Sequence, residues 1–311
     1  MIKTISIKQI FVNLLLLFLL VISQISVLQA KQVILSDVPD YKWWYGCSPT
    51  AVGMLIGYYD IHGYDGLRYD NLVPGGKAEL STFESIPGKW QYNVQYIIAS
   101  PEHIADFYRE GYGAKGDDAP PPYHDFNSLA DFMGTSQDSV DNPNGFTGFF
   151  LSSSRLYIAD IYNLRLQTGS GLYGIWKYID SCGYGTHDPA HDKTMFSQYV
   201  DTYVSGGFSF NDFMSEIDSG RPVIIHVEGH TMLGYGYDTE GQIIYIHDTW
   251  TPGPHTMTWG GEYHGRKQIG VTCIHITGGT PVPIPSSIIL ISSGLLAISF
   301  AYKRDKEGYI L

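Results

Sequence analysis

The sequence predicts an α+β fold in which an N-terminal helix packs on an antiparallel β-sheet. Residues 48–59 place apolar side chains at the three- and four-residue spacing of a helix. Residues 221–247 form apolar, β-branched and aromatic runs separated by turn formers, which is typical of adjacent strands. The region between the two terminal segments, residues 31–280, is large enough to bury one hydrophobic core. We therefore expect a single domain over 31–280 with a long insertion at about 61–220.

The predicted helix begins beside a lone cysteine. Ser48 suits the N-cap position, and Pro49 suits the first helical position, where a missing N–H costs nothing. Cys47 would then stand at the positive end of the helix dipole, which favours a thiolate and can lower a cysteine pKa from about 8.5 to about 3.5–7.5. Many free cysteines are simply small buried apolar residues. Cys47 is therefore a candidate nucleophile that needs partners from elsewhere in the chain.

The predicted strands supply those partners. One apolar strand precedes His230, a second follows it, and residues 242–247 form a third that runs into Asp248. A turn at 238–241 joins the last two strands, so antiparallel pairing would bring His230 and Asp248 side by side. A cysteine nucleophile needs a histidine to take its proton and a third group to orient the imidazole. Cys47, His230 and Asp248 fit these roles in that order.

The motifs at these positions resemble a known family. They are Gly-Cys-Ser-Pro-Thr-Ala at 46–51, Gly-His at 229–230, Gly-Tyr-Asp at 236–238, and the strand that ends in Asp248. Together they are similar to papain-like cysteine peptidases of the bacteriocin-leader-processing (C39-like) type and their exported relatives. The resemblance covers the two ends of the mature domain.

The resemblance implies a papain-like fold and thiol-dependent cleavage of peptide bonds in a peptide or protein substrate, with no cofactor and no metal. Cys47 becomes the nucleophile, His230 the general base and later the acid, and Asp248 the residue that orients His230. Trp250 resembles the aromatic residue that shields the histidine's hydrogen bond from water.

One position departs from that family. The resemblance implies a glutamine six residues before the cysteine, whose amide helps to bind the oxyanion, and this chain has Tyr41 there. The Cys47 N–H and the Tyr41 hydroxyl are the candidate donors. Loss of one oxyanion donor typically costs about 10²- to 10³-fold in rate. A surface or matrix binding protein with little or no turnover is therefore an alternative on the same fold, and acyl transfer by the same triad is another.

The N-terminus predicts export. Lys3 and Lys8 precede the apolar run 14–22, and small or polar residues continue to Ala30. This is the layout of a secretory signal peptide over residues 1–30. An uncleaved anchor is the alternative, but the apolar run is shorter than the about 20 residues that a membrane span needs.

The C-terminus predicts sorting at a membrane. Residues 281–311 open with Pro-Val-Pro-Ile-Pro, continue with an apolar stretch, and then reach Lys303 and Arg304. This resembles the PEP-CTERM protein-sorting segment, which implies a membrane sorting and processing machinery as a partner. A plain membrane anchor with a positive cytoplasmic tail is the alternative. Either arrangement leaves the domain outside the cytoplasmic membrane, in the cell envelope or the medium.

Composition agrees with export. Residues 31–280 hold 14 basic and 29 acidic side chains, a formal charge of about −15. Such a charge argues against nucleic acid and anionic membrane surfaces as partners and favours solubility. The 24 tyrosines and 6 tryptophans exceed what one core needs, so we expect an aromatic groove, which suits extended peptides or sugars.

The middle of the chain carries weaker signals. Residues 111–122 and 138–148 are rich in Gly, Pro, Asn and Asp and predict loops. Short helices are predicted at residues 101–110, 126–133, 172–181 and 210–219. The last of these closely precedes the strand that leads to His230, as a helix packed beside the sheet would.

Cysteine and histidine spacing adds two expectations. Three cysteines are an odd number for an exported chain, so Cys182 and Cys273 are candidates for a disulfide that leaves the helix cysteine free. His187 and His191 stand four residues apart beside carboxylates, as on a metal-binding helix face. Pro189 between them favours a solvated loop instead.

Three further residues in or near the predicted strands each have two possible roles. His226 and His247 are rival bases, but each lies within an apolar strand, where a packed core histidine is the commoner outcome. Glu228 lies two residues before His230 and either tunes it or is a solvated edge carboxylate.

Overall fold

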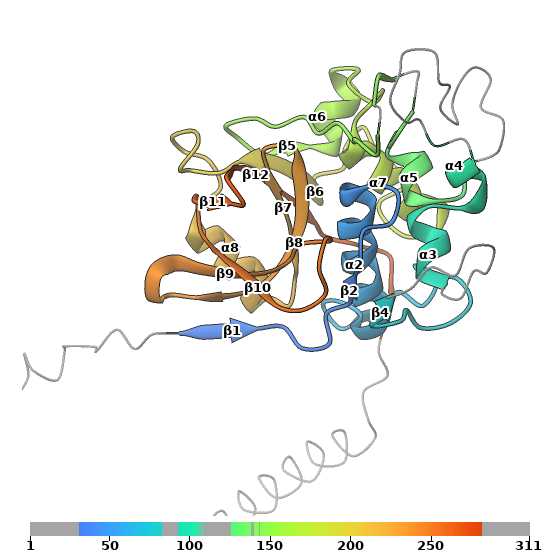
Figure 1. The fold of residues 1–311 in the computed structure, drawn as a ribbon. Coiled ribbons are helices and arrows are strands. Elements are labelled where there is room, and N and C mark those ends of the chain that lie inside the picture. Colours follow the sequence, from blue (N-terminus) through green and yellow to red (C-terminus); the bar gives the residue numbers. More distant parts are fainter. Residues whose placement is uncertain are drawn as a thin grey trace, which may run out of the picture.

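The computed structural model describes residues 31–82, 93–105, 107, 126–137, 140–142 and 144–281. At its centre lies an antiparallel sheet whose strands run in the order β10-β9-β8-β7-β12-β6-β5 (Figure 1). These strands are β5 (Leu156–Tyr157), β6 (Met195–Tyr199), β7 (Val223–Val227), β8 (His230–Asp238), β9 (Ile243–His247), β10 (His255–Thr258) and β12 (Arg266–Ile274). Two more strands, β1 (Gln32–Ile34) and β11 (Glu262–Tyr263), pair with β8 and β12.

Helices cover both faces of this sheet. The long helix α2 (Cys47–His62) packs against β8 and β7. On the side of α2 away from the sheet lie α3 (Asn93–Ile98) and α5 (Leu129–Phe132). The helix α5 packs in turn on α7 (Gly171–Ser181) (Figure 1). On the opposite face, α8 (Phe210–Asp218) packs against β8 and β7. The fold prediction, a helix packed on an antiparallel sheet in an α+β domain, is confirmed.

The smaller elements complete the chain. They are α4 (Pro101–Ala105), α6 (Ile158–Asn163), the 3₁₀ turn η2 (Glu240–Gln242), a parallel pair β2 (Asp40–Tyr41) with β4 (Ser81–Thr82), and an antiparallel pair β3 (Leu67–Arg68) with β13 (Thr280–Pro281). The described residues between 61 and 220 include β5 and β6, which are strands of the main sheet.

The strands β7 and β8 separate two hydrophobic clusters. Their side chains point alternately to the two faces of the sheet. Ile224 and its cross-strand partner Leu233 belong to the cluster around α2, whereas Ile225 and its partner Met232 belong to the cluster around α8. The sheet is therefore buried on both faces, which explains why every residue of β7 is buried and four of its five side chains are apolar.

The helix α2 is buried along most of its length, because it lies between the sheet and the outer helices. Every residue from Ser48 to Asp60 is buried. Glycines let the neighbours approach: a Cβ on Gly53 would lie 2.5 Å from a side-chain carbon of Ile98, and one on Gly57 would lie 2.7 Å from the Tyr41 hydroxyl. The helix carries no polar stripe because it has no solvent-facing side.

The start of α2 differs from the prediction. Gly46, with φ 145°, is the N-cap residue, and Ser48 lies inside the first turn. Thr50 closes this turn, since its hydroxyl donates to the Gly46 carbonyl at 2.6 Å and accepts from the Trp44 N–H at 3.0 Å. Ser48 is not free to cap because its hydroxyl lies 2.9 Å from that of Thr231 on β8.

The predicted short helices are largely confirmed. The helices α7 and α8 match the expected spans to within one residue at each end, and α4 begins at the expected Pro101. The helix expected from Phe126 starts later, at Leu129, because Ser128 forms a capping box with Asp131. The loop predicted at 111–122 lies outside the described residues, and the described part of 138–148 has no α-helix or strand.

The cysteine prediction is wrong. Cys182 and Cys273 both carry free thiols, as does Cys47. Cys182 is the C-cap residue of α7 and packs against the cluster around α2, whereas Cys273 lies in β12 within the cluster around α8. The sheet separates the two sulfurs, and this topology is not visible in the cysteine count.

The histidine pair at 187 and 191 lies in a loop, as expected. His187 Nδ1 lies 2.6 Å from a carboxylate oxygen of Asp180, and His191 Nδ1 lies 2.8 Å from one of Asp188. In the described part of the chain, no group of three His, Cys, Asp or Glu side chains is placed to hold a metal ion.

The predicted export and sorting segments lie at the two ends of the chain. Residues 1–30 and 282–311 lie outside the described residues. Across the part that the structure describes, none of the helices combines the length and the apolar character needed to cross a membrane.

Candidate active site

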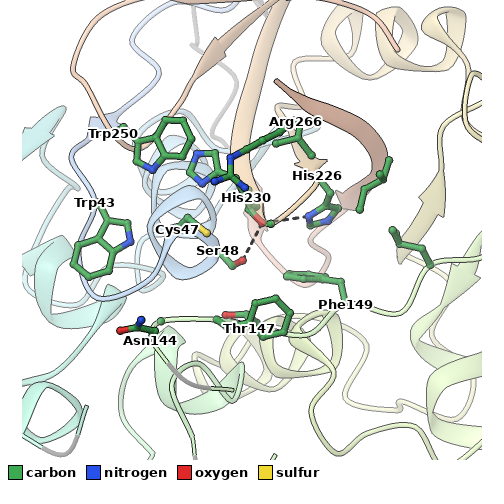
Figure 2. Close-up of a pocket in the computed structure, with 17 residues that line it drawn as sticks. Trp43, Cys47, Ser48, Asn144, Thr147, Phe149, His226, His230, Trp250 and Arg266 are labelled. Carbon is green, nitrogen blue, oxygen red and sulfur yellow. Dashed lines mark hydrogen bonds between the residues drawn. The ribbon is translucent and has the colours of Figure 1, made fainter. Parts of the chain in front are cut away.

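Cys47 and His230 line the same cavity, which has a volume of about 690 Å³ (Figure 2). Cys47 is the first residue of α2, and His230 is the first residue of β8. The hydrogen bond between the hydroxyls of Ser48 and Thr231 joins the residue after Cys47 to the residue after His230. The local structure of both elements therefore fixes the two candidate residues relative to one another.

The imidazole of His230 is held in one orientation. Its Nε2 lies 2.7 Å from the main-chain carbonyl oxygen of Asp248. A carbonyl can only accept, so Nε2 carries the hydrogen, and Nδ1 of the neutral ring is left as an acceptor. The indole of Trp250 stacks on the ring, with centroids 3.8 Å apart and planes at 16°. Only 5 % of His230 is exposed, so Trp250 helps to keep water from the Nε2 hydrogen bond.

Asp248 contacts His230 through its main chain, while its carboxylate has other partners. One carboxylate oxygen accepts from the N–H groups of Trp250 and Thr251, both at 2.8 Å. The other accepts from the Tyr263 hydroxyl at 2.8 Å. Burial raises the pKa of Asp248, but the hydrogen bonds from Thr251, Tyr263 and Trp250 outweigh it and hold that pKa below its usual value. The sequence correctly predicted that His230 and Asp248 are neighbours. Only the structure shows that the contact is made by the Asp248 carbonyl and not by its carboxylate.

The pKa values of Cys47 and His230 do not favour the thiolate that the sequence predicted. Burial raises the pKa of the Cys47 thiol, although hydrogen bonds from the Thr231 main chain and from Ser48 oppose it. Burial also lowers the pKa of His230 to about 4 against the opposing Asp248 carbonyl. Loss of water disfavours the charged form of both groups, and so opposes the thiolate that a helix dipole would favour. At neutral pH the resting pair is a thiol and a neutral imidazole.

Tyr41 does not reach the cavity, which corrects the expectation that it serves as an oxyanion donor. Its side chain is fully buried, and its hydroxyl donates to the main-chain carbonyl of Glu79. The hydroxyl lies beside Gly57, ten residues along α2 from Cys47, which is about 15 Å at the rise of a helix. Tyr41 supports the buried middle of α2 instead.

Comparison with known proteins adds the family. The Peptidase_C39 like family matches residues 35–263, which is most of the chain and includes Cys47, His230 and Asp248. The chain belongs to this family. No curated protein and no solved structure was found to match it. Membership suggests a cysteine peptidase, and hence a peptide substrate, on the fold described above.

The rival histidines of this Peptidase_C39 like chain are packed core residues. His226 lines the cavity but is buried, with Nε2 at 2.8 Å from Thr272 Oγ1 and Nδ1 at 3.3 Å from Thr231 Oγ1. Burial lowers the pKa of His226 to about 3, so it stays neutral. His247 is buried elsewhere and stacks on Tyr235 with ring centroids 4.3 Å apart. Both predictions are confirmed.

Several cavity residues had no signal in the sequence. The loop 144–151 forms one wall and contributes Asn144, Thr147 and Phe149 (Figure 2). It reaches the helix because Gly145 packs on Gly46: a Cβ at Gly145 would lie 3.2 Å from the Gly46 Cα. The Gly, Pro, Asn and Asp content of residues 138–148 predicted a loop here, but its contact with the start of α2 is a tertiary feature. Trp43 and Arg266 complete the rim of the cavity.

Proposed function

We propose that this chain is an exported cysteine peptidase in which Cys47 and His230 cleave peptide bonds. The observation that carries the proposal is that the cysteine at the start of α2 and the histidine at the start of β8 line one cavity, with Nδ1 of His230 left as an acceptor. Family membership supports the reaction class. The signal-peptide pattern of residues 1–30 supports a location in the cell envelope or outside the cell.

The chemistry follows from these groups. The Cys47 thiol passes its proton to Nδ1 of His230 as the sulfur attacks the peptide carbonyl. The main-chain N–H of Cys47 has no partner within the helix, because α2 starts at this residue, and it donates to the developing oxyanion. The imidazolium then protonates the leaving amine. Water, with its proton taken by His230, resolves the thioester and restores the thiol.

Asp248 and Trp250 support His230 in this proposal. The Asp248 carbonyl keeps the hydrogen on Nε2, so the basic nitrogen is always Nδ1, and it stabilises the imidazolium that forms during the reaction. Trp250 covers the ring and shields this hydrogen bond. Because both members of the pair are neutral at rest, proton transfer accompanies the attack rather than preceding it.

The test is hydrolysis of a fluorogenic peptide library by the mature domain. We expect Cys47→Ala to abolish cleavage and His230→Ala to lower it by about 10²- to 10⁴-fold, the usual contribution of a general base. Cys182→Ala is the matched control, since Cys182 lies at the end of α7, outside the cavity, and should keep the wild-type rate. Cleavage that survives Cys47→Ala would refute the proposal.

A binding protein on the same fold is the second candidate. The raised pKa of Cys47 favours it, because a neutral thiol is a poor nucleophile. The position of Tyr41 away from the cavity favours it too. Alkylation of Cys47 by iodoacetamide across pH separates the two. An inflection that moves to higher pH in His230→Ala shows that the imidazole takes the thiol proton. The same alkaline inflection in both proteins, together with no hydrolysis, favours binding without turnover.

A further inference from the structure

The cavity beside Cys47 differs in charge from the rest of the chain. Residues 31–280 carry 29 acidic and 14 basic side chains. Among the described residues that line the cavity, however, none is Asp or Glu, and Arg266 is the one Lys or Arg. A cavity that excludes carboxylates in a strongly acidic domain favours a ligand with negative charge.

Arg266 uses few of its hydrogen-bond donors within the described part of the chain. Its Nη1 donates to the main-chain carbonyl of Glu228 at 2.9 Å, and the guanidinium carbon lies 5.9 Å from the Trp250 ring centre. In the described part of the chain it pairs with no carboxylate. Guanidinium carries five N–H donors arranged to grip a carboxylate with two parallel hydrogen bonds. Most of these donors are free on an exposed side chain at the cavity rim.

The local backbone makes room for this guanidinium beside His230. A Cβ on Gly229 would lie only 2.9 Å from Nη1 of Arg266, and Gly229 also has φ 66°, which favours glycine. Arg266 therefore approaches the main chain directly before His230. Figure 2 shows Arg266 on the same side of the cavity as His230 and Trp250.

The side of the substrate that faces Arg266 follows from the proposed reaction, on which this step rests. The general acid must lie next to the leaving amine, because it protonates that nitrogen. The residues that follow the scissile bond are attached to this amine and so lie beside His230, Trp250 and Arg266. The N-terminal part of the substrate extends from the carbonyl that Cys47 attacks.

We propose that Arg266 selects substrates with a carboxylate on the C-terminal side of the scissile bond. The carboxylate is either the side chain of an aspartate or glutamate or the free C-terminus of a short peptide. Both sources present the same planar pair of oxygens to the guanidinium.

The experiment measures peptide binding to the full mature domain carrying Cys47→Ala, so that turnover does not interfere. The probes are a peptide with a central glutamate and its glutamine counterpart, each with a free or an amidated C-terminus. Binding is measured by the change in Trp fluorescence. We expect peptides with the recognised carboxylate to bind about tenfold more tightly, and the preference to weaken with salt. The glutamate-to-glutamine and free-to-amidated comparisons identify which carboxylate is used.

Matched variants test the residue. In Arg266→Gln the preference should disappear, whereas in Arg266→Lys part of it should remain because the charge is kept. Lys267→Gln is the charge control, because Lys267 is exposed, lies over the Tyr203 ring at 5.3 Å and does not line the cavity. Circular dichroism checks that each variant is folded.

The outcomes separate this inference from the proposed function. Equal binding of charged and neutral peptides, a preference that persists in Arg266→Gln, or no binding of any peptide overturns the role of Arg266. If the wild type cleaves peptides without regard to charge, the peptidase stands and the Arg266 proposal falls. If the carboxylate preference is present but the wild type never cleaves, the recognition site stands and the peptidase falls.

Discussion

At Asp248 the side chain and the main chain have separate partners. The carboxylate accepts hydrogen bonds from two N–H groups of the turn that follows and from the Tyr263 hydroxyl, and only 1 % of the residue is exposed. This fixes the turn, and the turn positions both the carbonyl that holds His230 and the Trp250 ring that covers it. The Asp248 carboxylate therefore helps to position the imidazole of His230 without touching it.

Asp248→Asn should destabilise the protein in a pH-dependent way. At pH 7 we expect a loss of about 1–2 kcal/mol in the free energy of unfolding, because the amide cannot accept every hydrogen bond that the carboxylate accepts. The pKa of Asp248 is lowered in the folded state, so its stabilisation is present above the unfolded pKa of about 3.9 and is lost as pH falls through the folded pKa. Urea unfolding of both proteins between pH 7 and pH 3 measures this.

The comparison has a clear control. Tyr263→Phe removes one of the hydrogen bonds to the carboxylate, so it should cost less than Asp248→Asn, about 1 kcal/mol. Equal stability of wild type and Asp248→Asn at pH 7 would contradict this role for the carboxylate.

At the scale of elements, the start of α2 decides where the candidate nucleophile sits. Gly46 provides the positive φ that turns the chain into the helix, and it packs closely against Pro49 and Thr135. The loop at 144–151 rests on the same glycine. A change at this position therefore moves both the sulfur and one wall of the cavity.

Gly46→Ala should destabilise the fold and impair the site. A Cβ would lie 2.7 Å from a Pro49 carbon and 2.8 Å from the Thr135 methyl group, at φ 145°. We expect a loss of about 1–3 kcal/mol in the free energy of unfolding and a larger relative loss of Cys47 reactivity. Gly76→Ala is the matched control, since Gly76 has φ 129° with nothing within 4 Å of its Cβ position. Similar losses in both variants would show that backbone strain alone matters.

At the scale of the whole molecule, the sheet buries two neutral histidines beside the cavity. Burial lowers the pKa of His226 to about 3 and that of His230 to about 4. In the unfolded chain both return to about 6.5. Between these values the unfolded state binds more protons than the folded state, so the free energy of unfolding rises with pH in this window.

The protein should therefore lose stability as pH falls below about 6.5. Each histidine contributes a slope of up to about 1.4 kcal/mol per pH unit toward pH 4. Unfolding by urea at steps between pH 7.5 and pH 4.5 measures the slope, which His226→Gln should reduce. His191→Gln should leave it unchanged, because the His191 side chain is 85 % exposed. A flat profile would mean that these histidines become charged in the folded state.

Local sequence predicted the elements that carry the site. The spacing of apolar residues predicted α2. The apolar, β-branched and aromatic runs after residue 220 predicted β7, β8 and β9. The turn between β8 and β9 brought His230 and Asp248 together because antiparallel pairing follows directly from a short connection. Sequence order and periodicity are sufficient for such features because each depends on neighbours along the chain.

The sequence by itself determined the helix with Cys47, the strand that carries His230, the strand that leads to Asp248, and the adjacency of His230 and Asp248. Only the tertiary structure decided that Gly46 caps α2, that Asp248 offers its carbonyl, that Tyr41 is buried away from the cavity, and that Cys182 and Cys273 lie on opposite sides of the sheet. It also placed Arg266 at the cavity rim. The physical reason is that hydrogen-bond partners and desolvation depend on which distant surfaces come into contact, and spacing along the chain does not encode those contacts.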